Sequence, residues 1–184
     1  MGGELKKMYL NMRDTTILTR CSEKKREELL KMYSNTENAI ILASKWYSKD
    51  KLAHAMRVAN YAIQEARILN YDSYDIEEIF QVAILHDILE DTKCPKEEIV
   101  RVVAYDVPIA AIERLTHQEE DSYEEYIKKL VDDSNIDMNI NTQVKSLAYA
   151  LIVKRADMKD HLMLEDTLTD KLKKKYYPIM KYLL

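Results

Sequence analysis

The sequence predicts an all-α fold, a compact bundle of several helices, and three observations favour this class. Glycine occurs only at Gly2 and Gly3, and proline only three times in 184 residues. The chain therefore lacks the residues that β-rich folds use for tight turns with positive φ. Apolar residues recur at helical spacing over most of the chain. Hydrophobic residues make up 47% and charged residues 33%, a balance that supports one globular domain with its own core.

Each predicted helix is a stretch of helical periodicity that ends at a polar or proline-containing break. Residues 1–35 are charge-dense with weak periodicity, and we interpret them as an N-terminal extension of a domain at 36–184. The predicted helix over residues 50–70, for example, keeps Leu52, Met56 and Ile63 on one face. The predicted helices cover residues 36–47, 50–70, 75–90, 96–105, 108–116, 122–132, 142–162 and 167–184.

Two prolines and one unusually apolar stretch refine this arrangement. Pro108 suits the first turn of the helix that it opens, and Pro178 is expected to kink the last helix. The stretch 75–90 is apolar almost all round, which is typical of a helix buried in the middle of a domain.

Composition also excludes several classes of function. Because no glycine follows Gly3, the chain has no phosphate-cradling P-loop, no dinucleotide-binding turn and no nucleophile elbow. A net charge of −4 argues against nucleic acid or anionic lipid as the main partner, although a small anionic ligand is compatible with it.

The cysteines and the lack of long apolar stretches indicate the compartment. Cys21 and Cys94 lie far apart with no CxxC or Cys/His pairing, as expected for free thiols in a reducing compartment. No stretch looks like a signal peptide or is long and uncharged enough to span a bilayer. We expect a cytoplasmic protein without a membrane partner. The sequence leaves the oligomeric state open, with a homo-oligomer among the alternatives.

The most informative segment is the charged end of the apolar stretch. On a continuous helix, His86, Asp87, Glu90 and Asp91 share one arc of roughly 140°. Buried carboxylates are costly unless something positive compensates them, and a divalent metal is one economical compensation. The alternative is that Glu90 and Asp91 are the solvated end of the helix.

Two further helices can contribute to the same site. His54 lies at the edge of the apolar stripe of its helix, where a histidine that merely packs in the core is the alternative. In the helix 142–162, Lys154, Asp157 and His161 follow one strip beside the apolar face. Two imidazoles and two carboxylates make a mixed N/O set that suits Mn²⁺, Fe²⁺, Zn²⁺ or a similar ion.

This order of residues resembles the HD-domain superfamily of metal-dependent phosphohydrolases over about residues 36–184. The segment His86-Asp-Ile-Leu-Glu-Asp-Thr92 looks like the H-D-x-x-E-D-T motif of guanosine tetraphosphate hydrolase domains of the RelA/SpoT type and their small single-domain relatives. Val153-Lys-Arg-Ala-Asp157 looks like the V-K-x-A-D segment of that group. The resemblance implies an HD-type helical bundle and a nucleotide as the phosphorylated substrate.

The resemblance also implies roles for individual residues. The metal, typically Mn²⁺ with Fe²⁺, Zn²⁺ or Mg²⁺ as alternatives, would be bound by two imidazoles and two carboxylates: His54, His86, Asp87 and Asp157. Glu90 and Asp91 would hold and deprotonate the attacking water, which is general-base chemistry. Substrate contacts are expected from Lys45, Lys154 and His161, the last at a position where the family commonly has Asn. For both lysines a solvated surface position is the alternative.

The chain also departs from the family pattern. The Arg-Lys pair, glycine turn and Pro-Tyr that precede the first metal-binding histidine are absent. Trp46 or Tyr47 could stack on a base instead, or simply pack in the core. Arg155 replaces the usual apolar residue before Ala-Asp, and the sequence does not explain it. The open alternatives to a guanosine tetraphosphate 3′-pyrophosphohydrolase are a phosphatase for a nucleoside monophosphate or the 2′-phosphate of NADPH, and a non-catalytic module that binds a nucleotide or a protein.

Overall fold

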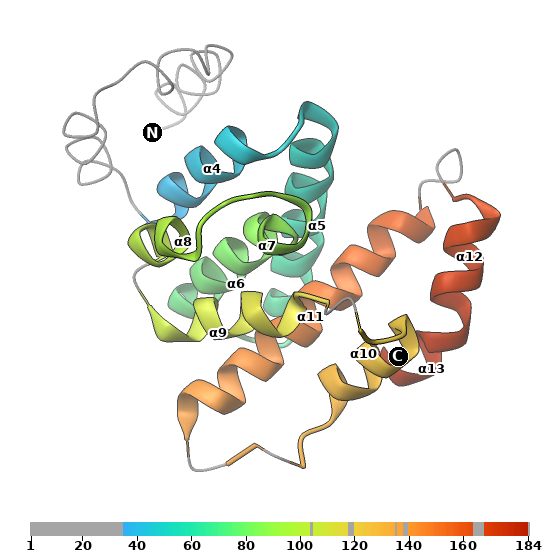
Figure 1. Cartoon of the computed structure of the whole chain (residues 1–184). Coiled ribbons are helices and arrows are strands. Elements are labelled where there is room, and N and C mark those ends of the chain that lie inside the picture. Colours follow the sequence, from blue (N-terminus) through green and yellow to red (C-terminus); the bar gives the residue numbers. More distant parts are fainter. Residues whose placement is uncertain are drawn as a thin grey trace.

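The computed structural model describes residues 35–103, 105–117, 120–134, 136–137, 140–163 and 168–183, and most of these residues lie in helices. Within these ranges no residue belongs to a strand, so the predicted all-α class is confirmed (Figure 1). The predicted extension at 1–35 lies, except for Asn35, outside the described residues. The elements are α4 (Asn35–Trp46), α5 (Lys49–Ile68), α6 (Ser73–Leu85), α7 (Ile88–Asp91), α8 (Lys96–Val103), α9 (Asp106–Leu115), α10 (Tyr123–Val131), α11 (Asn141–Met163), α12 (Asp170–Tyr176), η2 (Tyr177–Ile179) and α13 (Met180–Leu183).

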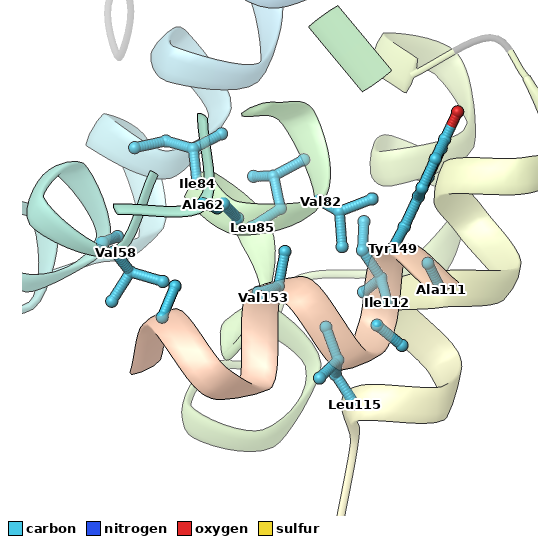
Figure 2. Packing of buried hydrophobic residues seen from close by; sticks show 14 of the residues in the cluster. Val58, Ala62, Val82, Ile84, Leu85, Ala111, Ile112, Leu115, Tyr149 and Val153 are labelled. Carbon is cyan, nitrogen blue, oxygen red and sulfur yellow. The ribbon is translucent and has the colours of Figure 1, made fainter. Parts of the chain in front are cut away.

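The core is built where α11 crosses three other helices. It contacts α5, α6 and α9, and α5 also packs along α6. Figure 2 shows the result: Val153 of α11 faces side chains from α5, α6 and α9. Ile84 and Leu85, at the end of α6, are fully buried there, as predicted for the apolar stretch. The site residues at that end of α6 are therefore attached to a closely packed part of the core.

Both ends of α5 are capped, and the cap at its C-terminal end uses asparagine where many proteins use glycine. The side chain of Ser48 caps the start of α5 by accepting from the N–H of Lys51. At the other end Asn70 adopts φ 59°, which asparagine tolerates better than most residues. The N–H groups of Asn70 and Tyr71 bond the carbonyls of Arg67 and Ala66, the pattern of a Schellman cap. A chain without internal glycine can thus still end a helix sharply.

The prediction of one continuous helix over 75–90 is wrong, because α6 ends at Leu85 and α7 begins at Ile88. In a continuous helix the carbonyl of Ala83 would accept from the N–H of Asp87. Here that carbonyl accepts instead from Nδ1 of His86, at 2.8 Å. Asp87 then takes φ −101° and ψ 4°, in the bridge region where many active-site residues lie. The break falls on the His-Asp pair itself.

The remaining helices follow the predicted order, with ends shifted by a few residues. Pro108 lies in the first turn of α9, and the chain around Pro178 divides into α12, η2 and α13, as the expected kink requires. In Figure 1, α10 lies beside α13, and α10 contacts α11, η2 and α13. Among the described helices, none combines the length and the apolar composition that a bilayer crossing needs.

Candidate metal centre

Three helices bring imidazole nitrogens to one carboxylate oxygen. Oδ1 of Asp157, on α11, lies 3.4 Å from Nε2 of His54, 3.9 Å from Nε2 of His86 and 3.2 Å from Nε2 of His161. The rings of His54 and His86 are 5.3 Å apart, and those of His54 and His161 are 4.8 Å apart. The predicted convergence of α5, α6 and α11 on one point is therefore present.

The opposite ring nitrogens fix the tautomers of two of these imidazoles. Nδ1 of His86 must donate to the Ala83 carbonyl, since a carbonyl only accepts. Nδ1 of His54 lies 2.8 Å from Oδ2 of Asp160, the carboxylate–histidine pair that commonly orients metal ligands. This leaves Nε2 of His54 facing Asp157, and Nε2 of His86 facing both Asp87 and Asp157. Both Nε2 atoms are buried and make no hydrogen bond, a condition that proteins rarely leave uncompensated.

Asp157 joins this cluster to a cation. It is 3% exposed, and while Oδ1 faces the imidazoles, Oδ2 accepts from the ammonium of Lys154 at 3.0 Å. Burial favours the neutral acid, but Lys154 and the neighbouring imidazoles outweigh it and hold the pKa of Asp157 well below its usual range. Burial likewise opposes the charge of Lys154, and Asp157 raises the pKa of that ammonium well above its usual value. Asp157 is therefore ionised and able to bind a cation.

Asp87 completes the cluster from the break after α6. Its Oδ2 lies 3.2 Å from Nε2 of His86 and also accepts from the ammonium of Lys51 at 2.9 Å. Burial opposes protonation of His86, but Asp87 and Asp157 together raise the pKa of His86 to about 9. Lys51 also pairs with Asp91. A metal bound at this point would replace the proton on His86 and would sit beside Lys51.

The donor set fits a divalent ion. Two groups of side chains could each place one donor atom within 4.8 Å of the others, His54 with His86 and Asp87, and His54 with Asp157 and His161. Ligands about 2.1 Å from a common ion lie roughly 3.0 to 3.4 Å from their neighbours in octahedral or tetrahedral geometry. The separations of 3.2 to 3.9 Å around Asp157 are close to this range.

Three residues that the sequence did not point to support the cluster. Asp160 is 1% exposed and binds His54 together with Arg57, whose Nε and Nη2 donate to Oδ1 and Oδ2 at 2.7 and 2.9 Å. Lys51 neutralises Asp87. The available signal was spacing, since Arg57 follows His54 by three residues and Asp160 follows Asp157 by three, which places each pair on one helix face.

The structure does not bring every predicted residue to the cluster. The ammonium of Lys45 is held by both carboxylate oxygens of Glu98, at 2.8 and 2.7 Å, in a contact between α4 and α8. Glu90 and Asp91 are exposed on α7. Glu90 Oε2 accepts from the backbone N–H of His117 at 3.3 Å, whereas Asp91 pairs with Lys51.

The structure explains three residues whose roles the sequence left open: Trp46, Tyr47 and Arg155. Tyr47 is buried in the core, so core packing rather than base stacking describes it. The indole N–H of Trp46 donates to Glu98. Arg155 pairs with Glu65 of α5, where Nε donates to Oε1 at 2.6 Å. A charged residue on this face of α11 thus joins α11 to α5.

Comparison of the chain with protein-family models, with curated proteins and with solved structures finds no significant match. The resemblance to HD-type hydrolases therefore stays a prediction, and any functional conclusion depends on the residues described above.

Proposed function

We propose that the protein is a metal-dependent phosphohydrolase that acts on a nucleotide, most specifically as a 3′-pyrophosphohydrolase of guanosine tetraphosphate. One observation carries the metal: the buried Nε2 atoms of His54 and His86 make no hydrogen bond and lie 3.4 and 3.9 Å from one oxygen of Asp157, with Asp87 3.2 Å from that of His86. The motif His86-Asp-Ile-Leu-Glu-Asp-Thr92 carries the more specific substrate.

The chemistry proposed for the site divides between binding and proton transfer. A divalent ion held by His54, His86, Asp87 and Asp157 supplies a Lewis acid for a phosphoryl oxygen and a water of lowered pKa. Glu90 is the favoured proton acceptor, because its carboxylate is exposed on α7, the helix that follows Asp87, and pairs with no lysine in the described part of the chain. Asp91 is paired with Lys51, which suits it to holding rather than deprotonating the nucleophile.

Charge near the cluster favours a phosphorylated substrate. Lys154 lies one turn before Asp157 and remains protonated, and His161 lies at the more open side of the cluster with a side chain 30% exposed. An ammonium at this place stabilises the charge that develops on a phosphoryl group during displacement.

The test uses full-length protein that is stripped with a chelator and reloaded with Mn²⁺. We expect release of pyrophosphate from guanosine tetraphosphate. Release of orthophosphate from a nucleoside monophosphate or NADPH would move the same site to another substrate. A protein that binds Mn²⁺ and hydrolyses none of these substrates would overturn the enzymatic proposal and favour a binding module.

Two variants separate metal binding from proton transfer. Asp87→Ala is expected to abolish metal binding. Glu90→Gln is expected to keep the metal while turnover falls by about 10²- to 10⁴-fold, the usual contribution of a general base. Glu97→Gln, an exposed position on α8, is the matched control and should behave as wild type. Loss of metal in Glu90→Gln would contradict the proposed division of roles.

A further inference from the structure

A group of aromatic and cationic side chains borders the cluster on the side of α10 and α12. Its centre is Tyr123, at the start of α10. The ammonium of Lys154 lies 5.4 Å from the centroid of the Tyr123 ring, and that of Lys175 lies 4.2 Å from it. Tyr126 and Tyr176 add rings 5.7 and 5.9 Å from Tyr123. Ammonium groups from two different helices, α11 and α12, therefore lie near the same aromatic ring.

The polar atoms of this group are not all satisfied. The hydroxyl oxygen of Tyr123 is buried, and no group of the described residues accepts its proton; the nearby ammonium of Lys154 can only donate to that oxygen. The hydroxyl of Tyr126, in contrast, donates to the carbonyl of Leu115 at 2.6 Å. A buried hydroxyl without an acceptor is destabilising, and in native proteins it usually indicates a water, an ion or a ligand. Tyr123 therefore has a donor available for a bound group.

The charges are also unbalanced. Lys154 is 7% exposed and is compensated by Asp157. Lys175 is more exposed and pairs with no carboxylate in the described part of the chain, where Glu90 and Asp157 act on it only at longer range. Partial loss of hydration of its ammonium, and then the charge of Lys154, lower the pKa of Lys175. An anion placed between the two lysines would relieve this repulsion.

We propose that Lys154, Lys175 and the hydroxyl of Tyr123 form a subsite for a phosphoryl group beside the His54–His86–Asp157 cluster. Two ammonium groups and a hydroxyl supply several donors from different directions, which matches a tetrahedral dianion with many acceptor oxygens. Its position next to the reacting centre follows from Asp157, whose two oxygens face the imidazoles and Lys154 respectively.

The subsite deepens the proposed function, and its assignment to the substrate rests on that function, but anion binding can be tested without catalysis. The probe is inorganic pyrophosphate, titrated calorimetrically into full-length, metal-free protein at low ionic strength. We expect wild type to bind it, Lys175→Met to weaken binding about tenfold and Tyr123→Phe to weaken it about threefold. The control is Lys174→Met, which removes an exposed lysine of the same helix and should leave the affinity unchanged.

The outcomes distinguish this proposal from the proposed function. Equal affinity of wild type, Lys175→Met and Tyr123→Phe, or equal weakening by Lys174→Met and Lys175→Met, overturns the subsite. Circular dichroism of each variant establishes that it is folded. Asp87→Ala, which removes a metal ligand, should still bind pyrophosphate. If the Mn²⁺-loaded protein hydrolyses no nucleotide while pyrophosphate binds as described, the enzymatic proposal fails and the subsite stands.

Discussion

Asp160 gives the sharpest test of the metal centre because the sequence did not suggest it and the geometry assigns it a defined task. Its Oδ2 holds Nδ1 of His54 at 2.8 Å, and Arg57 bonds both carboxylate oxygens. Asp160→Asn keeps the shape of the side chain but removes its charge and turns one acceptor into a donor. With the amide nitrogen facing His54, the imidazole proton moves to Nε2, where it blocks a metal. With the amide oxygen facing His54, the amide nitrogen meets Arg57, which also only donates.

The expected loss of metal affinity in Asp160→Asn can be estimated, because either orientation of the amide disturbs His54. Removing a carboxylate that orients a metal-binding histidine typically weakens metal affinity by 10- to 100-fold, which is about 1.4 to 2.8 kcal/mol. Asp160 is 1% exposed, so water cannot easily replace the lost acceptor, and we expect the upper part of this range. Asp157→Asn, which removes a ligand itself, should cost more.

The assay is calorimetric titration of Mn²⁺ into chelator-stripped protein at a fixed pH. Asp170→Asn is the matched control, because that aspartate has a side chain 92% exposed and pairs only loosely with Lys173 at 3.4 Å. Wild-type affinity in Asp160→Asn, with the variant folded, would refute the reasoning that Asp160 holds His54 for a metal. So would an equal loss in Asp170→Asn.

Three further predictions use other parts of the molecule. Lys51→Met should bind divalent ions several-fold more tightly than wild type in the same titration, since the ammonium paired with Asp87 repels a second cation; unchanged affinity would contradict this. Burial opposes the ionisation of Asp75, but its bonds from Lys145 and Tyr149 lower its pKa, so its stabilisation is present above the ordinary pKa near 4 and is lost as the pH falls below it. Urea unfolding at pH 3 to 6 should therefore show a flatter acid limb for Asp75→Asn, and an unchanged limb would refute it. Ile84→Ala, at a fully buried position, should lower the free energy of unfolding by about 2 to 5 kcal/mol in urea melts, and a loss below about 1 kcal/mol would contradict the packing described.

Much of the fold could be predicted because helical periodicity and the lack of glycine are visible in short stretches of the sequence. The helix at 142–162 and the division of the last helix at Pro178 follow from such local signals. The break after α6 could not be predicted in this way. It depends on the side chain of His86 taking the Ala83 carbonyl, and periodicity carries no information about a side chain that competes with the backbone for an acceptor.

The site could be predicted only as far as residue order and spacing reach. His54, His86 and Asp157 meet because three helices pack as the apolar faces require. Which charges pair with each other depends on the packed structure. The sequence makes Lys45 a plausible phosphate contact, but in the structure its ammonium is bound by Glu98 of α8. Asp160 is 106 residues from His54 along the chain, and no local pattern joins the two.

The sequence predicts a metal because clustered carboxylates need a compensating positive charge. In the structure the carboxylates already have such charges, and the imidazole nitrogens are the groups that favour a metal. Each buried or half-buried carboxylate of the centre already has a cation: Lys154 at Asp157, Lys51 at Asp87 and Arg57 at Asp160. The groups of the centre that make no hydrogen bond are nitrogens, the Nε2 atoms of His54 and His86, which face the carboxylates of Asp157 and Asp87. Imidazole-rich sets favour Zn²⁺, Fe²⁺ and related ions over Mg²⁺, which prefers oxygen ligands and retains its water. Of Mn²⁺, Fe²⁺, Zn²⁺ and Mg²⁺, we therefore expect Mg²⁺ to bind this centre most weakly.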